Sequence, residues 1–372
     1  MSLSKVRLTP GVPLTEQCNR GHNRWHPDIC PCARIKAGAR IEIETLDGID
    51  GQITRKTKAD DLAAVDMGRI HPLTGPVYVE GAEPGDLLEI KIEEINPASD
   101  GFTMIMPGFG FLREHFTKPF LAHWEMSGGY ARSEQLPGVR IPGAPFMGVM
   151  GLAPSHELLD RIIVREAELA RRGGMVFPPD PVNAVPREQG IASRAIRTIA
   201  PHETGGNLDI KQLTAGTTLY LPVYVPGGLF SVGDAHFAQG DGESCGTAIE
   251  TSATFVARFD VLKGEARRRR QVDPSFSIEA VGSSATSATS RRYYATTGTC
   301  VNRDGRNESE NVTLATQNAL LNMIDYLVDS RGFTREQAYC LTSVVVDLKI
   351  SQVVDVPNMI VSAFLPLDIF EN

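Results

Sequence analysis

The chain has 372 residues, of which 42% are hydrophobic and 22% are charged, and its formal net charge is −8. These proportions are those of a globular protein, and the acidic balance argues against a nucleic-acid partner, which would require a basic face. No apolar run approaches the roughly 18 residues that span a bilayer, and the first twelve residues carry no apolar core of a secretory signal. We therefore expect a cytoplasmic protein with no membrane partner.

The N-terminal half predicts short strands joined by turns. Residues 39–45 and 87–95 alternate polar and apolar side chains, which is the pattern of a half-buried strand. A further strand at 77–80 precedes a turn whose proline and glycine suit a tight reversal. The region 106–150 is rich in glycine, proline and aromatic residues with little periodicity, so we expect a long ordered loop region near the site.

The C-terminal half predicts further strands at 218–225 and 246–261 and two convincing helices. Apolar residues recur at helical spacing over 311–329, and Thr334 followed by Gln337 forms a capping-box pattern that opens a helix over 334–346. A third helix is predicted within the N-terminal half, over 157–172. Four arginines at 267–270 indicate a hairpin tip or subunit contact, and the Ser/Thr/Ala tract at 282–290 indicates a turn or linker.

The fold class that these elements predict is β-rich α+β. Short strands with Gly/Pro turns favour an antiparallel β-sandwich or jelly-roll-like core, with the C-terminal helices packed on it. We divide the chain into a β-rich part over residues 1–200, which includes the loop region 106–150, and a β plus helical part over 201–372. The two parts are expected to form one tightly joined unit.

The segment 229–250 concentrates polar and reactive side chains. Within twelve residues it carries Asp234, His236, Gln239, Asp241, Glu243 and Cys245. Side chains two apart on a strand share a face, which predicts that Asp234 lies beside His236 and that Asp241, Glu243 and Cys245 lie together. Glycines between them allow the backbone to fold the two short faces towards each other. The parity of a regular strand would point Glu250 away from Glu243.

Several motifs resemble the acetamidase/formamidase family of small-amide hydrolases. GDAHFAQGDGE at 233–243 is similar to the family signature, and HNRWHPD at 22–28 is similar to formamidases. Five more motifs follow the family's order: DGQI at 50–53, MPGFGFLR at 106–113, PFMGVMGLAP at 145–154, GGNLD at 205–209 and SQVVD at 351–355. The resemblance runs from about residue 20 to residue 370. It implies a homo-oligomer with a divalent metal, zinc among the candidates, and it includes relatives that open γ-lactams.

Amide hydrolysis needs an activated water or nucleophile, a stabilised oxyanion and an acid for the leaving nitrogen. A metal held by Asp209, Asp234 and His236 would activate water, and His22, His26 and Asp28 are further ligand candidates. We assign proton transfer to Glu243, its orientation or further ligation to Asp241, and oxyanion stabilisation to Asn207. The residues expected at the substrate are His22, Trp25 and Gln239.

Cys245 is the alternative, as a nucleophile. Its acidic neighbours would raise the pKa of the thiol, and the sequence around it is typical of a packed strand, where a free cysteine is usually a small hydrophobic residue. The metal route is therefore the favoured interpretation.

The sequence predicts metal-dependent hydrolysis of small linear amides, formamide or acetamide, to carboxylate and ammonia. HNRWHPD is formamidase-like, whereas CGTAIE at 245–250 is closer to acetamidases, so the acyl group stays open. A γ-lactamase is the first alternative. A small-ligand-binding β-sandwich with a structural calcium ion is the alternative from another class, although His236 argues against calcium, which prefers oxygen ligands. The physiological amide, the metal and the subunit number stay open.

Overall fold

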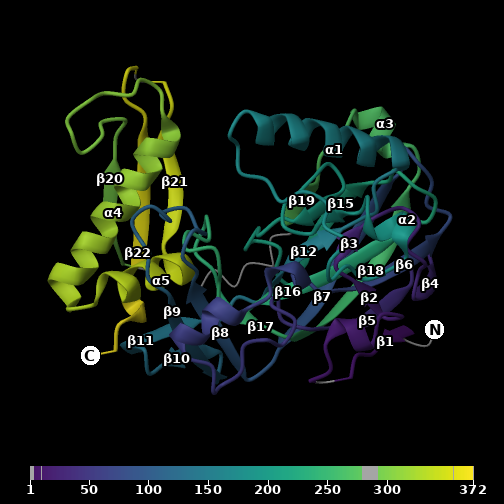
Figure 1. Ribbon diagram of the computed structural model, residues 1–372, viewed down its shortest axis with the longest axis horizontal. Coiled ribbons are helices and arrows are strands. Elements are labelled where there is room, and N and C mark those ends of the chain that lie inside the picture. Colours follow the sequence, from purple (N-terminus) through teal and green to yellow (C-terminus); the bar gives the residue numbers. More distant parts are fainter. Residues whose placement is uncertain (1–3, 10, 279–291, 355, 372) are drawn as a thin grey trace.

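The structure is a computed structural model that describes residues 4–9, 11–278, 292–354 and 356–371. It is a β-rich α+β protein, in which two large sheets and a smaller helical unit lie side by side (Figure 1). The tract at 282–290, for which we expect a turn or linker, lies outside the described residues. Within the described ranges, no helix has both the length and the hydropathy that a membrane span requires.

The first large sheet has six strands. In spatial order they are β1 (Ser4–Val6), β5 (Arg40–Thr45), β18 (Ala253–Leu262), β7 (Leu87–Pro97), β15 (Thr217–Pro222) and β19 (Ser275–Ile278). The pairs are antiparallel except for β1 with β5. Burial alternates along β5 with period two, as its sequence predicts. The strands predicted at 39–45, 87–95 and 218–225 are confirmed by β5, β7 and β15.

The second large sheet carries the polar segment. Its main path is β11 (Leu136–Pro142), β10 (Tyr130–Ser133), β9 (Phe120–Ser127), β8 (Asp100–Ile105), β17 (Glu250–Thr251), β16 (Phe230–His236), β12 (Phe146–Gly151) and β14 (Gly205–Asn207). Strand β6 (Leu73–Glu80) pairs with β16 and also with β2 (Gly21–His22) and β4 (Ala33–Lys36), and a separate short pair joins β3 (Arg24–Trp25) to β13 (Ile196–Arg197).

The long loop region expected over 106–150 is a wrong prediction. Only its first part, before Phe120, lacks strands, and β9 to β12 fill the rest. Glycine and proline occur there because three short strands reverse within a few residues, for example through the left-handed Gly128 and Gly129 (φ 58° and 81°). Short strands with irregular pairing carry too little periodicity to be recognised in sequence.

One apolar core fills the space between the two large sheets. Phe230 of β16 contacts both Phe255 and Phe259 of β18, at ring-centroid distances of 6.2 and 4.9 Å. Strands from the two halves of the chain alternate in both sheets, since β18 lies between β5 and β7 and β16 lies beside β12. The sheets consequently need both halves of the chain to be complete.

The C-terminal helices cover a three-stranded sheet and the β8–β11 end of the second large sheet. That small sheet has the order β20 (Tyr293–Gly298), β22 (Ile360–Pro366), β21 (Asp347–Gln352), and α4 (Val312–Arg331) packs on β20 and β22. Helix α5 (Arg335–Val345) begins at Thr334, whose side chain accepts from the Gln337 amide, so the capping box is confirmed. The predicted helices at 311–329 and 157–172 are confirmed by α4 and by α1 (His156–Arg171).

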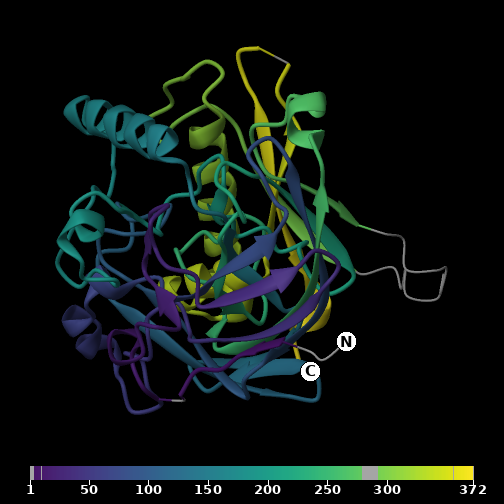
Figure 2. The same ribbon diagram turned by 90° about the vertical axis from the view of Figure 1, so that its right-hand side faces the viewer.

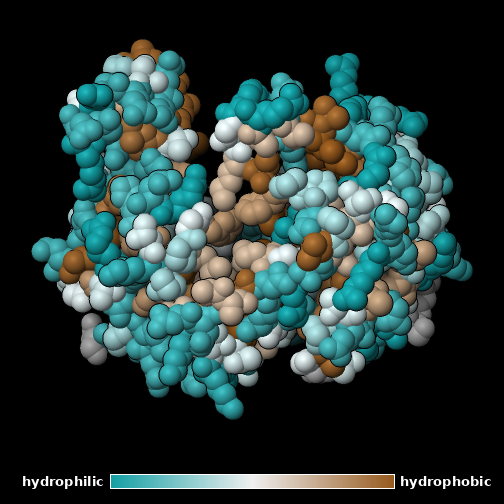
Figure 3. Space-filling model, in the orientation of Figure 1, coloured by the Kyte–Doolittle hydropathy of each residue, from teal (hydrophilic) through white to brown (hydrophobic). Residues whose placement is uncertain are grey.

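Helix α1 and the β21–β22 hairpin rise on the same side of the molecule in both ribbon views (Figure 1 and Figure 2). The space-filling view shows this face hollowed between them, with apolar surface inside the hollow (Figure 3). Two short helices complete the fold: α2 (Gln189–Ala192) and α3 (Glu265–Arg269). The four arginines therefore belong to a helical turn and its left-handed cap at Arg270, and the prediction of a hairpin tip is wrong there.

Candidate active site

Strand pairing brings the polar residues of the second sheet together. Glu250 of β17 lies directly opposite His236 of β16, and β14, whose last residue is Asn207, pairs with β12 beside β16. Residues opposite each other in an antiparallel pair share a face of the sheet. Side chains that are far apart in the chain therefore meet at one point, where β16 ends.

His236 is the centre of a cluster of carboxyl groups. Its Nε2 atom lies 3.3 Å from Glu250 Oε2, 3.5 Å from Asp234 Oδ2 and 3.9 Å from Glu243 Oε1. On the other edge of the ring, Nδ1 lies 3.9 Å from Asp209 Oδ1. Four carboxyl groups thus surround one imidazole whose side chain is 1% exposed.

The backbone at three of these carboxyl groups is strained. Asp209, Asp234 and Glu243 have φ of 47°, 57° and 40°, a left-handed region that non-glycine residues enter at an energetic cost. Such strain persists only where the surrounding structure enforces it, and it concentrates at functional sites. The fold therefore holds these carboxyl groups where a relaxed strand would not place them.

Gly148 of β12 makes room for the cluster. A Cβ atom at this position would lie 2.6 Å from Asp209 Oδ1, 2.7 Å from Asp234 Oδ2 and 2.9 Å from His236 Cε1. Gly48 does the same on the other side, where a Cβ would meet Asp234 Oδ1. The two glycines leave a small cradle that any larger residue would fill.

Gln239 fixes the orientation of the His236 ring. Its Nε2 donates to the Asp209 carbonyl oxygen at 2.9 Å, so its Oε1 faces His236 Nδ1, also at 2.9 Å. An amide oxygen only accepts, and therefore Nδ1 carries the hydrogen. In the neutral ring, the bare lone pair of Nε2 then points into the carboxyl cluster, as it does in histidines that ligate metals.

Burial and mutual repulsion shift the pKa values of the cluster. Burial raises the pKa of Asp209 to about 7 and that of Glu250 to about 7. Burial and the Asp209 carboxylate raise the pKa of Glu243 well above its ordinary value. Although burial lowers the pKa of His236, the Glu250 and Asp234 carboxylates outweigh this effect and raise it well above its ordinary value. The cluster therefore needs positive charge at its centre.

The donor set fits a divalent cation. Four buried atoms at the site have no hydrogen-bond partner among the residues that the structure describes: Asp209 Oδ1, His236 Nε2, Glu250 Oε2 and Asn207 Oδ1. Two groups of three have ligand atoms close enough to share an ion: Asp209, His236 and Glu243, and Asp234, His236 and Glu250. Unpaired buried polar atoms are expensive, and a cation would satisfy them.

A pocket of about 110 Å³ opens on this cluster. Its polar end is formed by Asn207, Asp209, Asp234, Glu243 and Glu250, with His71 beside them. The His71 ring faces Asp234, with 4.0 Å between Nε2 and Oδ2, while its Nδ1 lies 3.2 Å from the Thr198 carbonyl oxygen. The rest of the wall is largely apolar and includes Ile49, Met67, Ile70, Met104, Met106, Phe109, Phe177 and Ile199.

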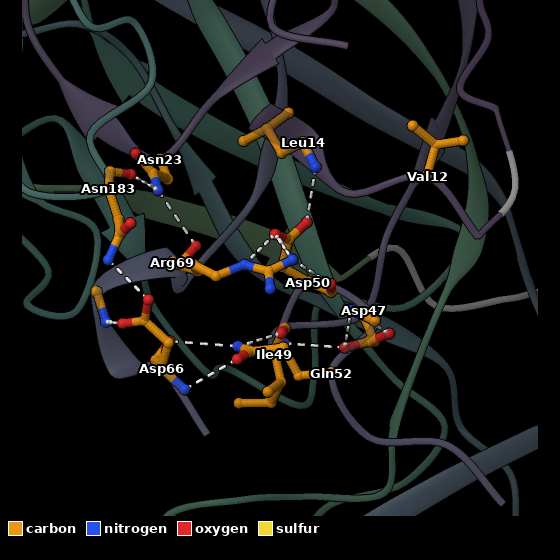
Figure 4. A network of polar contacts seen from close by, with 12 residues as sticks. Val12, Leu14, Asn23, Asp47, Ile49, Asp50, Gln52, Asp66, Arg69 and Asn183 are labelled. Carbon is orange, nitrogen blue, oxygen red and sulfur yellow. Dashed lines mark hydrogen bonds and ion pairs between the residues drawn. The ribbon is translucent and has the colours of Figure 1, made fainter. Parts of the chain in front are cut away.

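A network of polar contacts joins segments that carry residues of this wall (Figure 4). The Arg69 guanidinium donates to Asp50 Oδ2 through Nε at 2.8 Å and Nη2 at 2.5 Å. The Gln52 side chain both accepts from and donates to the backbone of Asp66. The segments that the network joins supply four pocket residues: Ile49, Met67, Ile70 and His71.

Of the residues predicted from sequence, Asn207, Asp209, Asp234 and Glu243 line the pocket, and His236 lies at the centre of the cluster. Cys245 also lines the pocket. Its side chain is buried, and burial raises the pKa of the thiol to about 11. A thiol with such a pKa is a poor nucleophile at neutral pH.

Three predicted residues lie elsewhere. His22 and Trp25 are buried away from the pocket, where their rings meet edge to face and His22 Nε2 lies 2.6 Å from Ser231 Oγ. Asp241 turns outward, and its carboxylate accepts from Gln212 at 3.0 Å. His22 and Trp25 are therefore interior packing residues, and Trp25 belongs to an apolar cluster with Val149, Leu158 and Ile196. We withdraw His22 and Trp25 as substrate contacts, together with the orienting role of Asp241.

The further ligand candidates His26 and Asp28 also lie outside the pocket. They form a separate surface group with His156, and the Asp28 and His156 side chains are more than half exposed.

The prediction that Glu250 faces away is wrong. That prediction assumed a regular strand from 243 to 250, whereas the chain turns between these residues, where Gly246 has a φ of 90°. Parity is lost across such turns, and β17 then places Glu250 opposite His236. His71, Gly48 and Gly148 were also missed. Only Gly148 had a sequence signal, as part of the PFMGVMGLAP motif.

The chain is similar to known proteins along nearly its whole length. The sequence model of the Acetamidase/Formamidase family matches residues 8–372. A formamidase of Methylophilus methylotrophus is 36% identical, with 98% of this chain and 93% of the relative covered. An acetamidase of Mycolicibacterium smegmatis is 35% identical, with 88% and 86% covered.

A solved structure agrees with these sequence relatives. It is a gamma lactamase from Delftia acidovorans that superposes with a TM-score of 0.93 at 33% identity, over 99% of this chain and 94% of that one. The motifs, the full-length sequence matches and the shared fold lead to one conclusion: the chain belongs to the acetamidase/formamidase family.

Proposed function

We propose that this protein hydrolyses the C–N bond of small linear amides, formamide and acetamide foremost, to a carboxylate and ammonia. The observation that carries the proposal is the cluster of four carboxyl groups around His236, open to a small pocket on one side. The formamidase and acetamidase relatives support the same activity.

Glu243 is our choice for the proton transfers. Burial raises the pKa of its carboxyl group well above the ordinary value, which makes the carboxylate a stronger base for proton transfer. In the proposed reaction, Glu243 Oε1 takes a proton from the attacking water and delivers it to the amide nitrogen, so that the C–N bond breaks with ammonia as the leaving group. Burial of the carboxyl group keeps bulk water from competing for that proton.

Asn207 is suited to hold the amide group. One of its Nδ2 hydrogens is donated to the Ile199 carbonyl oxygen at 3.1 Å, which leaves the second hydrogen for the oxyanion. Its buried Oδ1 has no partner among the described residues and can accept an N–H of the substrate. The side chain thereby distinguishes the oxygen of the amide from its nitrogen.

We propose that the divalent metal is zinc and that Asp209, Asp234 and His236 would hold it. Two groups of three share His236: one adds Asp209 and Glu243, and the other adds Asp234 and Glu250. When bound, the ion would supply a Lewis acid and lower the pKa of water. Gln239 keeps the His236 ring in the tautomer that such an ion requires.

A γ-lactam is the second candidate substrate, because the gamma lactamase of Delftia acidovorans shares the fold over nearly its whole length. A lactam presents the same carbonyl and nitrogen atoms to the site. We further propose a β-sandwich core formed by the two large sheets, a homo-oligomeric assembly and a cytoplasmic location, as expected from the sequence.

The proposal is tested with formamide, acetamide and 2-pyrrolidinone, assayed for ammonia or ring opening before and after chelation. We expect turnover of the linear amides, loss of activity on chelation and recovery with zinc. Cys245→Ala is expected to keep most of the activity. Activity that survives complete metal removal and disappears in Cys245→Ala would refute the metal route in favour of the thiol.

A further inference from the structure

The aromatic pair of Phe109 and Phe177 closes the apolar side of the pocket. The two rings meet edge to face, with 6.5 Å between their centroids and 65° between their planes. They come from different loops, Phe109 from the loop after β8 and Phe177 from the loop after α1. An edge-to-face pair of this kind is a favourable contact in its own right.

The two rings are held differently. Phe109 lies flat against Gly246, where a Cβ atom would come within 2.5 Å of its Cε1, and its amide donates to Met106. Phe177 lies in the irregular segment that follows α1 and, like Phe109, is partly buried. The close contact with Gly246 ties Phe109 to the wall, whereas Phe177 can be changed without disturbing that contact. Neither residue belongs to a strand or helix.

The pocket volume limits the length of the acyl chain. A dry cavity of about 150 Å³ accommodates benzene, which has six heavy atoms. On that scale the 110 Å³ of this pocket takes about four or five heavy atoms. Formamide has three heavy atoms and would leave part of the apolar wall uncovered. Acetamide has four heavy atoms and propionamide has five.

We propose that Phe177, resting on Phe109, is the specificity-determining residue that limits the acyl chain of the substrate to that of propionamide. This inference rests on the proposed amidase function. The amide group lies at Asn207 and the carboxyl cluster, and the acyl chain extends towards Met104 and Met106 until it meets the Phe177 ring. Methionine side chains adapt to chains of different length, so the aromatic ring sets the limit.

The test compares kcat/KM along the series formamide, acetamide, propionamide, butyramide and valeramide. For the wild-type protein we expect a rise of roughly fourfold for each methylene up to propionamide, since burying one CH2 contributes about that factor. For butyramide and valeramide we expect a lower kcat/KM than for propionamide. Phe177→Ala should raise the valeramide-to-propionamide ratio of kcat/KM by at least roughly fifteenfold, because two further methylenes become buried and the wild-type obstruction is removed.

Two further variants make the test specific. Phe177→Trp should lower propionamide turnover at least roughly tenfold while formamide turnover changes less than about threefold, since only the longer chain reaches the enlarged ring. Phe276→Ala, which removes an exposed ring from β19, should leave the whole series unchanged.

The outcomes separate this inference from the proposed function. An active enzyme whose valeramide-to-propionamide ratio stays within about threefold of wild type in Phe177→Ala overturns the inference alone. A change in that ratio in Phe276→Ala would likewise overturn it, because the effect would not depend on the pocket. A wild-type protein that hydrolyses no amide in the series overturns the proposed function and this inference with it.

Discussion

Replacing Gly148 by alanine tests the cradle directly. Gly148 does not have positive φ, so alanine adopts the same backbone and the substitution acts only through its Cβ atom. That atom would lie within 3 Å of Asp209, Asp234 and His236 at once. Because the contacts involve three different side chains, moving one of them away leaves the other two in place.

The magnitude follows from the distances. Asp209 Oδ1 would have to retreat from 2.6 Å to at least 3.4 Å, a displacement of about 0.8 Å. Misplacing reacting groups by about 1 Å lowers the rate of an enzyme by roughly 100-fold, which corresponds to about 2.7 kcal/mol of transition-state stabilisation. Overpacking of the buried site should reduce the free energy of unfolding by about 1–3 kcal/mol.

The assay is kcat/KM with acetamide, together with metal content and chemical unfolding of the same preparation. Gly190→Ala is the matched control, because its Cβ would meet no atom within 4 Å and its φ is not positive. We expect a roughly 100-fold loss for Gly148→Ala and none for the control. A Gly148→Ala enzyme with full metal content and activity within threefold of wild type would refute the reasoning.

Three further predictions concern the cluster, the interior and the network. Glu243→Gln should lower kcat by roughly 10²- to 10⁴-fold with little change in the unfolding midpoint, measured by assay and thermal melt; an unchanged kcat with lost stability would indicate a structural role. Burial lowers the pKa of His22 to about 4. Below pH 6.5 the unfolded state therefore binds a proton that the folded state does not bind, and the free energy of unfolding decreases as the pH is lowered from 6.5 towards 4. By pH 5 the loss is about 2 kcal/mol, and urea unfolding of His22→Gln should lack this slope, whereas an unchanged slope would contradict the assignment. Arg69→Met removes the cationic partner of the buried Asp50 carboxylate and should lower the free energy of unfolding, measured in urea, by about 3–5 kcal/mol. The control Arg55→Met, at an exposed ion pair, should lower it by less than about 1 kcal/mol.

Local signals in the sequence predicted the elements and residues that depend on neighbours in the chain. Helix α5 follows from its capping box, and β5 from its period of two. The pairing of Asp234 with His236 follows from their separation by two residues on one strand. The family motifs, taken in their order along the chain, predicted the amide-hydrolysing activity. The capping box, the period of two and the Asp234–His236 pair each involve residues that are close together in the chain.

Only the tertiary structure decided which side chains complete the site. His71 reaches the cluster from the segment before β6 and Gly148 reaches it from β12, because both strands pair with β16. Parity failed for Glu250 because left-handed turns interrupt the strand before it.

Asp241 was predicted at the site and lies outside it. Its carboxylate accepts a hydrogen bond from Gln212, whereas Glu243, two residues further on, lines the pocket. Such outcomes depend on long-range pairing and on competition between hydrogen-bond partners. The spacing of residues along one chain carries no information about either.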